Sequence, residues 1–222
     1  MGDPARKAAL YDAFARTGKA LSSGKRLELL DLLAQGERTV DALAKAAGLN
    51  LTTASAHLQT LKQAGLVATR REGVRIHYRL AGDDVAALYA LLRQVAQAHQ
   101  TAVEPARTAY LGTDDAAEVD REDLLARTAA GEVVILDVRP AEEYVAGHIP
   151  GARSIPVEEL ADRIAELPEE TEVVTYCRGA YCVLAYDAVR LLRESGRRAV
   201  RLTDGMLEWR LAELPEERES AA

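Results

Sequence analysis

An apolar stretch that ends in a cysteine and leads into a helical segment most constrains the fold of this 222-residue chain. Residues 173–176 are typical of a buried strand, Cys177 opens a short loop, and helical spacing starts at Val183. A cysteine in that position faces loop amides and a helix N-terminus, which both stabilise an anion. We therefore interpret Cys177 as a thiolate nucleophile. The alternative is a small buried core residue, but the polar Arg178 and Gly179 follow where a core would continue.

Two further apolar runs, residues 133–137 and 199–202, have the length of buried parallel strands. Helical segments are predicted around these strands, at residues 121–128, 141–145, 157–166, 183–193 and 206–211. Strands that alternate with helices predict an α/β domain with a mainly parallel central sheet. Reactive groups in such sheets collect at the carboxyl ends of the strands, which is where Cys177 lies.

Charge is unevenly distributed along the chain, whose net charge is −7. Residues 1–100 carry a net charge of +5 and residues 101–222 a net charge of −12, which favours two domains with different partners. The basic half suits a polyanion. No apolar run approaches the roughly 18 residues of a membrane span, and the charged N-terminus lacks a secretory core. We therefore expect a cytoplasmic protein without a membrane partner.

The basic half has the pattern of a helix-turn-helix. Thr39 is a favourable N-cap for a helix over residues 40–47, Gly48 ends that helix, and a second helix begins at Asn50. In this motif the second helix enters the major groove, where hydroxyls and amides read bases and lysine contacts phosphate. The residues expected to face DNA are Thr52, Thr53, Ser55, Ala56, His57, Gln59 and Lys62. For His57, packing within the protein is the competing interpretation.

A basic hairpin follows the second helix. Alternating basic and apolar residues over positions 75–80 predict a strand, with Glu72 and Gly73 at the tip. Behind a helix-turn-helix, such a hairpin is the wing of a winged helix. Its arginines suit phosphate or minor-groove contacts, and we assign Arg70, Arg71 and Arg75 to DNA.

Residues 10–100 resemble the ArsR-type winged helix-turn-helix of bacterial repressors. Residues 25–30, 39–44, 55–67 and the hairpin carry this resemblance. It implies a repressor that binds double-stranded operator DNA as a homodimer, pairing through its first helix and a helix over about residues 83–100. The latter helix carries an apolar stripe of Leu88, Leu91, Leu92 and Val95. Packing inside one chain would explain this stripe equally well.

The same family often senses metal through a cysteine pair in the first helix of the motif. Residues 40–47 contain no cysteine, and His77 and His99 have no partner at ligand spacing. We therefore expect neither a metal nor a cofactor, and place the sensing function elsewhere in the chain. Helical periodicity weakens from Thr101 to about Asp120, where Pro105 and Gly112 interrupt it. These boundaries predict a DNA-binding domain over residues 1–100, a linker over 101–120 and an α/β domain over 121–217.

The α/β half resembles a single-domain rhodanese, a sulfurtransferase module. Separated segments carry this resemblance in order: residues 136–140, 143–144, 147–152, 155–156, the cysteine loop, 204–205 and Trp209. The resemblance implies that Cys177 takes a sulfane sulfur from thiosulfate, polysulfide or a persulfide and passes it to a thiophilic acceptor. The implied substrate-binding loop, whose N–H groups cradle the cysteine persulfide, comprises Arg178, Gly179, Ala180, Tyr181, Cys182 and Val183.

Several residues around the loop acquire roles from this resemblance. Asp137 and Arg139 match a pair that supports the loop as a strand-end salt bridge, and His148 is expected to stabilise a turn. Arg178 is expected to attract thiosulfate, and Tyr181 to gate or line the pocket.

Cys182 has two interpretations. It is either a small residue in the first helical turn or a resolving thiol that attacks the Cys177 persulfide and forms a disulfide. Many rhodanese loops carry glycine three residues after the cysteine, whereas here Gly179 is two residues after it, which leaves thiosulfate turnover open. Val183 occupies the position of the arginine that clamps a dianion in phosphatase and arsenate-reductase relatives, so this loop suits sulfur better.

Taken together, the patterns predict two domains: a mainly-α winged helix-turn-helix, then an α/β rhodanese-like domain with a mainly parallel central sheet. The first functional hypothesis is a DNA-binding regulator in which sulfuration or oxidation of Cys177 changes operator affinity. The second is an active thiosulfate or persulfide sulfurtransferase with an accessory DNA-binding domain. A third is a loop that only binds an oxyanion.

Overall fold

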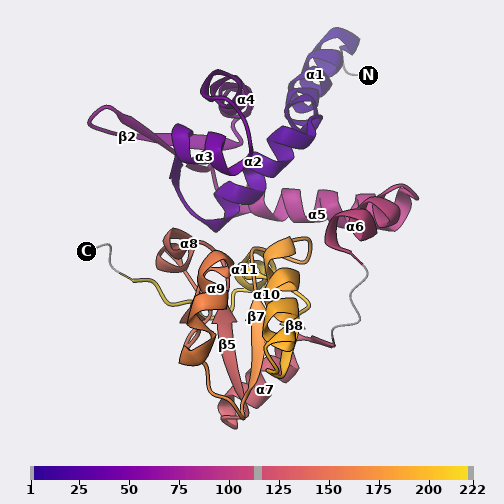
Figure 1. Ribbon diagram of the computed structural model, residues 1–222. Helices are drawn as coiled ribbons and strands as arrows, with labels where there is room; N and C mark the ends of the chain where they lie inside the picture. The colour runs from indigo at the N-terminus through magenta and orange to yellow at the C-terminus, as the bar shows by residue number, and fades with distance from the viewer. Residues whose placement is uncertain (1–2, 113–116, 220–222) are drawn as a thin grey trace. The chain divides into compact units, whose positions relative to one another are not determined.

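The computed structural model describes residues 3–112 and 117–219, and the chain divides into two compact units, residues 1–91 and 92–222 (Figure 1). Residues 1–2 of the predicted DNA-binding domain and residues 113–116 of the predicted linker lie outside the described part. The boundary between the two units lies within helix α5 (Asp83–His99). The last residues of this helix therefore belong to the second unit.

The first unit has the predicted winged helix-turn-helix fold. Its helices before α5 are α1 (Pro4–Leu21), α2 (Gly24–Gln35), α3 (Val40–Ala46) and α4 (Leu51–Gln63). Its strands are β1 (Arg38–Thr39), β2 (Val67–Glu72) and β3 (Arg75–Leu80), in the antiparallel order β1-β3-β2. Helices α3 and α4 form the helix-turn-helix, and the hairpin of β2 and β3 forms the wing. Buried leucines such as Leu43, Leu58 and Leu61 fill the space between the helices.

Side chains at the helix starts explain the boundaries of α3 and α4. The Thr39 hydroxyl accepts the Ala42 N–H at 3.3 Å, and the Asn50 side chain accepts the Thr53 N–H at 2.8 Å. These contacts satisfy amides that have no partner inside the helix. Ser23 occupies the N-cap of α2, but its side chain makes no capping hydrogen bond.

The predicted linker contains a helix, α6 (Val103–Leu111). Pro105 does not prevent it, because Pro105 is the third residue of the helix, where a backbone N–H has no acceptor within the helix. Gly112 ends α6 with a positive φ of 83°.

The second unit is an α/β domain with a five-stranded sheet in the order β4-β8-β7-β5-β6, in which every described strand pair is parallel. The strands are β4 (Glu118–Val119), β5 (Val133–Asp137), β6 (Arg153–Ser154), β7 (Glu172–Tyr176) and β8 (Ala199–Leu202). The sequence analysis missed β4 and β6, since strands of two residues show no alternation.

Five described helices pack around this sheet, and a 3-10 turn follows one of them. They are α7 (Arg121–Ala129), α8 (Ala141–Ala146), α9 (Val157–Arg163) with the turn Ile164–Glu166, α10 (Val183–Glu194) and α11 (Met206–Leu211). Alternate strand residues face two separate cores. One core joins the sheet to α9 and α10, which lie in front of it in Figure 1, and contains Cys177. The other joins the opposite face to α7 and α11 and contains Trp209. None of the described helices is long and apolar enough to cross a membrane.

Candidate cysteine site and DNA-binding surface

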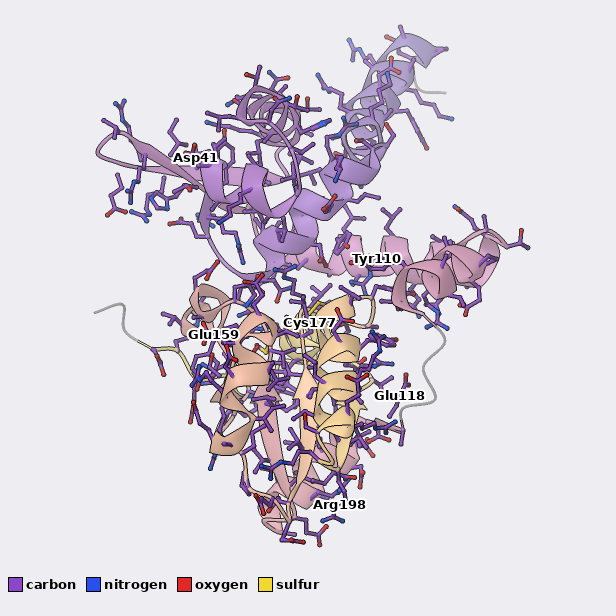
Figure 2. All side chains as sticks on the ribbon, viewed as in Figure 1. Asp41, Tyr110, Glu118, Glu159, Cys177 and Arg198 are labelled. Atoms are coloured by element: carbon purple, nitrogen blue, oxygen red, sulfur yellow. A yellow bond between two sulfur atoms is a disulfide. The ribbon has the colours of Figure 1, made fainter. Side chains whose placement is uncertain are left out.

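Cys177 directly follows β7, at the carboxyl end of the central strand of the sheet. In Figure 2 it lies at the opposite end of the sheet from Arg198. It is joined by a disulfide to Cys182, the N-cap residue of α10, with 6.1 Å between the two Cα atoms. The residues between them form the loop that the sequence predicted, and the disulfide shows that both sulfur atoms reach each other within it.

The loop presents several backbone amides that lack an acceptor. In the described part of the chain, the N–H groups of Gly179, Ala180 and Tyr181 make no hydrogen bond to protein. The Cys182 N–H donates to the Gly179 carbonyl at 3.1 Å. Clustered amides at the start of a helix form a favourable site for an anion.

Helix α11 holds the other side of the same loop. The Met206 N–H donates to the Cys177 carbonyl and the Leu207 N–H to the Arg178 carbonyl, both at 3.0 Å. Gly205, the N-cap residue of α11, lies directly against the loop, because a Cβ atom on it would be 2.3 Å from the Gly179 nitrogen. A side chain at position 205 therefore does not fit unless the loop moves.

Arg178 is paired with a buried carboxylate. Its Nε and Nη2 atoms donate to Glu143 Oε1 at 2.9 and 2.7 Å, and Glu143 is only 1% exposed. Such a two-point contact is among the stronger ion pairs in proteins. The expectation that Arg178 attracts thiosulfate is therefore not supported by its geometry, since Glu143 neutralises its charge.

A second ion pair borders the loop within the same unit. Arg93, in the last turns of α5, donates to Glu208 of α11 at 2.7 Å, and its guanidinium lies 4.8 Å from the centre of the Tyr181 ring. The Tyr181 hydroxyl also bonds to Gln97. Burial raises the pKa of Glu208, and this effect outweighs the opposing attraction of Arg93. Tyr181 thus packs at the edge of the loop.

Below the loop, a buried hydrogen-bond network joins β5 to β7. Arg139 Nη2 donates to Asp137 Oδ2 at 2.6 Å, and the Tyr176 hydroxyl donates to the same oxygen at 2.5 Å. Arg139 also donates to the Gly147 carbonyl, and Tyr176 accepts the Ile149 N–H. Burial disfavours the charge of Arg139, but Asp137 outweighs this and raises the pKa of the guanidinium. These hydrogen bonds tie the end of β5 to the end of β7.

His148 lies in the turn beyond this network. Its ring stacks on Tyr144 with 3.7 Å between the ring centres, and its Nδ1 atom lies 2.9 Å from the Tyr144 carbonyl oxygen. Its backbone pairs with Glu217 in an isolated antiparallel bridge. These contacts are those of a residue that stabilises a turn.

The predicted DNA-reading residues of α4 differ in exposure. Thr52, Ala56, Gln59 and Lys62 are exposed, whereas Thr53, Ser55 and His57 are partly buried. The Gln59 side chain donates to the Tyr78 hydroxyl at 3.0 Å, and Lys62 Nζ donates to Thr69 Oγ1 at 3.0 Å. Both side chains must leave these partners to contact DNA, which their exposure permits.

The wing arginines are not equivalent. Arg70 is held by two carboxylates, with its Nη2 atom 2.6 Å from Glu37 Oε1 and its Nη1 atom 2.8 Å from Glu72 Oε2. Arg71 and Arg75 are exposed, and the Arg71 side chain donates to the Gly73 carbonyl at 3.0 Å. The charge of Arg70 is therefore largely balanced by Glu37 and Glu72, whereas the Arg75 side chain is exposed.

Sequence reasoning missed Glu143, Gly205, Glu208 and Arg93 as neighbours of the loop. Glu143 lies 35 residues from Arg178, and no local pattern links them. Glu143 and Gly205 each carried a weak signal, since both belong to segments that supported the rhodanese resemblance. Among the described residues, no group of three or more His, Cys, Asp or Glu side chains is arranged to hold a metal ion.

Comparison with known proteins finds a different family for each half of the chain. Residues 23–69 match the family described as bacterial regulatory protein, arsR family, and residues 120–212 match the rhodanese-like domain. The HTH-type transcriptional regulator Rv0324 of Mycobacterium tuberculosis is 60% identical over 214 residues, which cover 96% of this chain and 94% of the relative. The chain belongs to the arsR family of transcriptional regulators.

This arsR-family regulator also has relatives that match one half of it. A sulfurtransferase of Allochromatium vinosum is 34% identical over 100 residues, covering 44% of this chain and 92% of that protein. A solved structure of the homodimeric winged helix-turn-helix DNA-binding domain of Mb0332 from Mycobacterium bovis is 62% identical. The match covers 45% of this chain and 93% of the chain in that structure, with a TM-score of 0.42.

Proposed function

We propose that this arsR-family regulator binds double-stranded operator DNA as a homodimer and that Cys177 is its receptor for sulfane sulfur. The observation that carries the proposal is the placement of Cys177 in a loop of unpaired amides, within bonding distance of a second cysteine. The amides favour an anionic sulfur, and the second cysteine offers a way to convert a bound sulfur into a lasting change of the loop.

The chemistry requires no external oxidant beyond the sulfur donor. The Cys177 thiolate attacks the outer sulfur of a persulfide R–S–SH, the S–S bond of the donor breaks, and R–S⁻ leaves. Cys177 then carries a persulfide. The Cys182 thiolate attacks Sγ of Cys177, HS⁻ leaves, and the Cys177–Cys182 disulfide forms. Two cysteines lose two electrons, and the sulfane sulfur gains them as it is released as sulfide.

The DNA-binding part of the proposal rests on the first unit. Helix α4 exposes hydroxyl, amide and ammonium groups, and the wing exposes Arg71 and Arg75, which suit base edges and phosphates. Exposed apolar side chains on the helices that pair in the family support a homodimer, namely Leu10, Tyr11, Phe14, Leu88, Leu91 and Val95. We further propose that the protein acts in the cytoplasm, as a repressor that the disulfide state releases from its operator.

A binding experiment on the full-length chain tests this proposal. Reduced protein, the same protein after polysulfide treatment, and a Cys177→Ser variant are titrated against operator DNA, with intact mass measured on each sample. We expect polysulfide to add 32 Da transiently, then to leave the disulfide and lower operator affinity by about tenfold or more, a change of about 1.4 kcal/mol. The Cys177→Ser variant should not respond. Equal affinity of all three samples would contradict the proposal.

A second candidate function is turnover as a sulfurtransferase, which the similarity to the Allochromatium vinosum protein favours. Cyanide-dependent thiocyanate release measures this activity. A rate no better than that of Cys177→Ala excludes it. If no 32 Da adduct forms with any donor, the loop acts only as an oxyanion site.

A further inference from the structure

We infer that the cysteine loop accepts sulfur from small organic persulfides, which carry at most one negative charge on the reacting sulfur chain, and discriminates against the thiosulfate dianion. The inference rests on the proposed function and narrows its substrate class. It follows from the charges that surround the loop in the described part of the second unit.

The first observation is that Arg178, the cation next to the nucleophile, is neutralised. Its guanidinium makes a two-point contact with Glu143 at 2.7 to 3.1 Å, and the Glu143 side chain is 1% exposed. A buried carboxylate that loses its guanidinium partner would be left without compensation, so Arg178 cannot turn toward a ligand at little cost.

The second observation concerns the other cation beside the loop. Arg93 Nη1 would be 3.4 Å from a Cβ atom on Gly179, so it borders the loop backbone, but Arg93 is paired with Glu208 at 2.7 Å. Glu208 Oε2 would be even closer to that Cβ atom, at 3.1 Å. The charged groups at this edge therefore include an anion at least as close as the cation.

The Arg178–Glu143 and Arg93–Glu208 pairs are each neutral overall, so neither adds a net positive charge at the loop. The amide dipoles of the loop remain. Amides hold the single negative charge of the Cys177 thiolate. A thiosulfate ion brings two further negative charges to an anionic nucleophile, and their repulsion requires a net cation nearby. A neutral or monoanionic donor meets less repulsion. When the Cys177 thiolate attacks it, the leaving group is a thiolate rather than the sulfite dianion.

Both reactions balance, so the selection acts on rate rather than on stoichiometry. With a persulfide, Cys177–S⁻ and R–S–SH give Cys177–S–SH and R–S⁻. With thiosulfate, Cys177–S⁻ and S–SO₃²⁻ give Cys177–S–S⁻ and SO₃²⁻. In the second reaction all three negative charges gather around the loop in the transition state.

The test uses the full-length chain with Cys182→Ser, which prevents the disulfide and preserves the persulfide for mass spectrometry. Reduced protein is mixed with cysteine persulfide or with thiosulfate, and the rate of the 32 Da gain is measured for each donor. We expect the rate with the persulfide to exceed that with thiosulfate by at least tenfold. The sulfur should map to the peptide that contains Cys177.

Two variants connect this ratio to the Arg178–Glu143 pair. Glu143→Gln keeps the shape of the side chain but leaves the charge of Arg178 uncompensated, and should lower the ratio of the persulfide rate to the thiosulfate rate about tenfold. The double variant Glu143→Gln with Arg178→Gln removes both charges and should restore the ratio. Circular dichroism and unfolding curves establish that each variant is folded.

The outcomes separate the inference from the proposed function. If thiosulfate reacts as fast as cysteine persulfide, or if Glu143→Gln leaves the ratio unchanged in a folded protein, the inference is wrong while Cys177 remains a sulfur acceptor. If neither donor adds sulfur, the proposed function itself fails.

Discussion

The two cysteines of the loop differ in how easily a thiol in solution can reach them. Cys177 is 1% exposed and packs among the residues between the sheet and α10, whereas Cys182 is partly exposed at the start of that helix. Thiol–disulfide exchange proceeds by in-line attack on one sulfur and releases the other as a thiolate. Access therefore favours attack on Cys182, with Cys177 leaving as the thiolate that the loop amides stabilise.

This asymmetry predicts where a small thiol adds. When the disulfide form is treated briefly with limiting glutathione and quenched with acid, the mixed disulfide should form on Cys182 at least tenfold more often than on Cys177. Trypsin cleavage after Arg178 places the cysteines in different peptides, so mass spectrometry distinguishes them. Unfolding the protein before the reaction is the control, and should make the two positions similar. A majority of adduct on Cys177 in the folded protein would refute the assignment.

Glu208 gives a prediction for pH. Burial raises the pKa of this carboxyl above its ordinary value of 4.5, so the folded state binds a proton more tightly than the unfolded state. The resulting contribution to stability is present below that ordinary pKa and is lost as pH rises through the raised value. The free energy of unfolding of wild type, relative to Glu208→Gln, should therefore fall as pH increases from 4 to 8. Urea unfolding at several pH values measures the difference, and a difference that grows with pH would contradict the prediction.

At the scale of elements, the contact of α11 with the cysteine loop depends on Gly205. Its φ of −148° is open to any residue, so the requirement for glycine is steric, since a Cβ atom would be 2.3 Å from the Gly179 nitrogen. The two hydrogen bonds from α11 to the Cys177 and Arg178 carbonyls depend on the same close approach.

Gly205→Ala should therefore displace the loop. We expect a loss of about 1–3 kcal/mol of stability, as for overpacking of a well-packed site, together with slower reaction of Cys177 with polysulfide. Thermal unfolding and the rate of mass gain measure the two effects. Gly18→Ala is the matched control, because a Cβ atom at position 18 of α1 meets no atom within 4 Å. Wild-type behaviour of Gly205→Ala would show that the loop tolerates the displacement.

The elements themselves could largely be predicted from the sequence. Apolar runs and capping residues such as Thr39 and Asn50 act locally, and the predicted helices and long strands agree with the structure to within a few residues. Cys177 could be singled out because a cysteine between a strand and a helix is also a local pattern, and its chemical role stays a prediction. The contacts of Glu143 with Arg178 and of Glu208 with Arg93 could not be predicted, since they join residues 35 positions apart or on different helices.

At the scale of the whole molecule, exposed apolar side chains on α1 and α5 remain to be covered. Tyr11 and Phe14 on α1 are 61% and 63% exposed, and Leu91 on α5 is 56% exposed. In the proposed homodimer these residues meet the second copy, and burying them supplies the main stabilisation of the pair.

Phe14→Asp should therefore weaken the homodimer by at least tenfold and reduce operator affinity with it, because two half-sites bind together only when the protein is paired. Analytical ultracentrifugation and DNA titration measure both effects. Leu125→Asp is the control, since Leu125 is also exposed, at 44%, but lies on α7 of the second unit. An unchanged sedimentation profile for Phe14→Asp would rule out α1 as the pairing surface.

The disulfide closes a ring between residues only five positions apart in the sequence. A bond over so short a span removes little freedom from an unfolded chain, about 2 kcal/mol in the chain-entropy view. Making or cutting it therefore changes the local chemistry without deciding whether the domain survives. In the proposed mechanism, the same molecule can therefore pass through the disulfide state and back many times, because its fold outlasts each cycle.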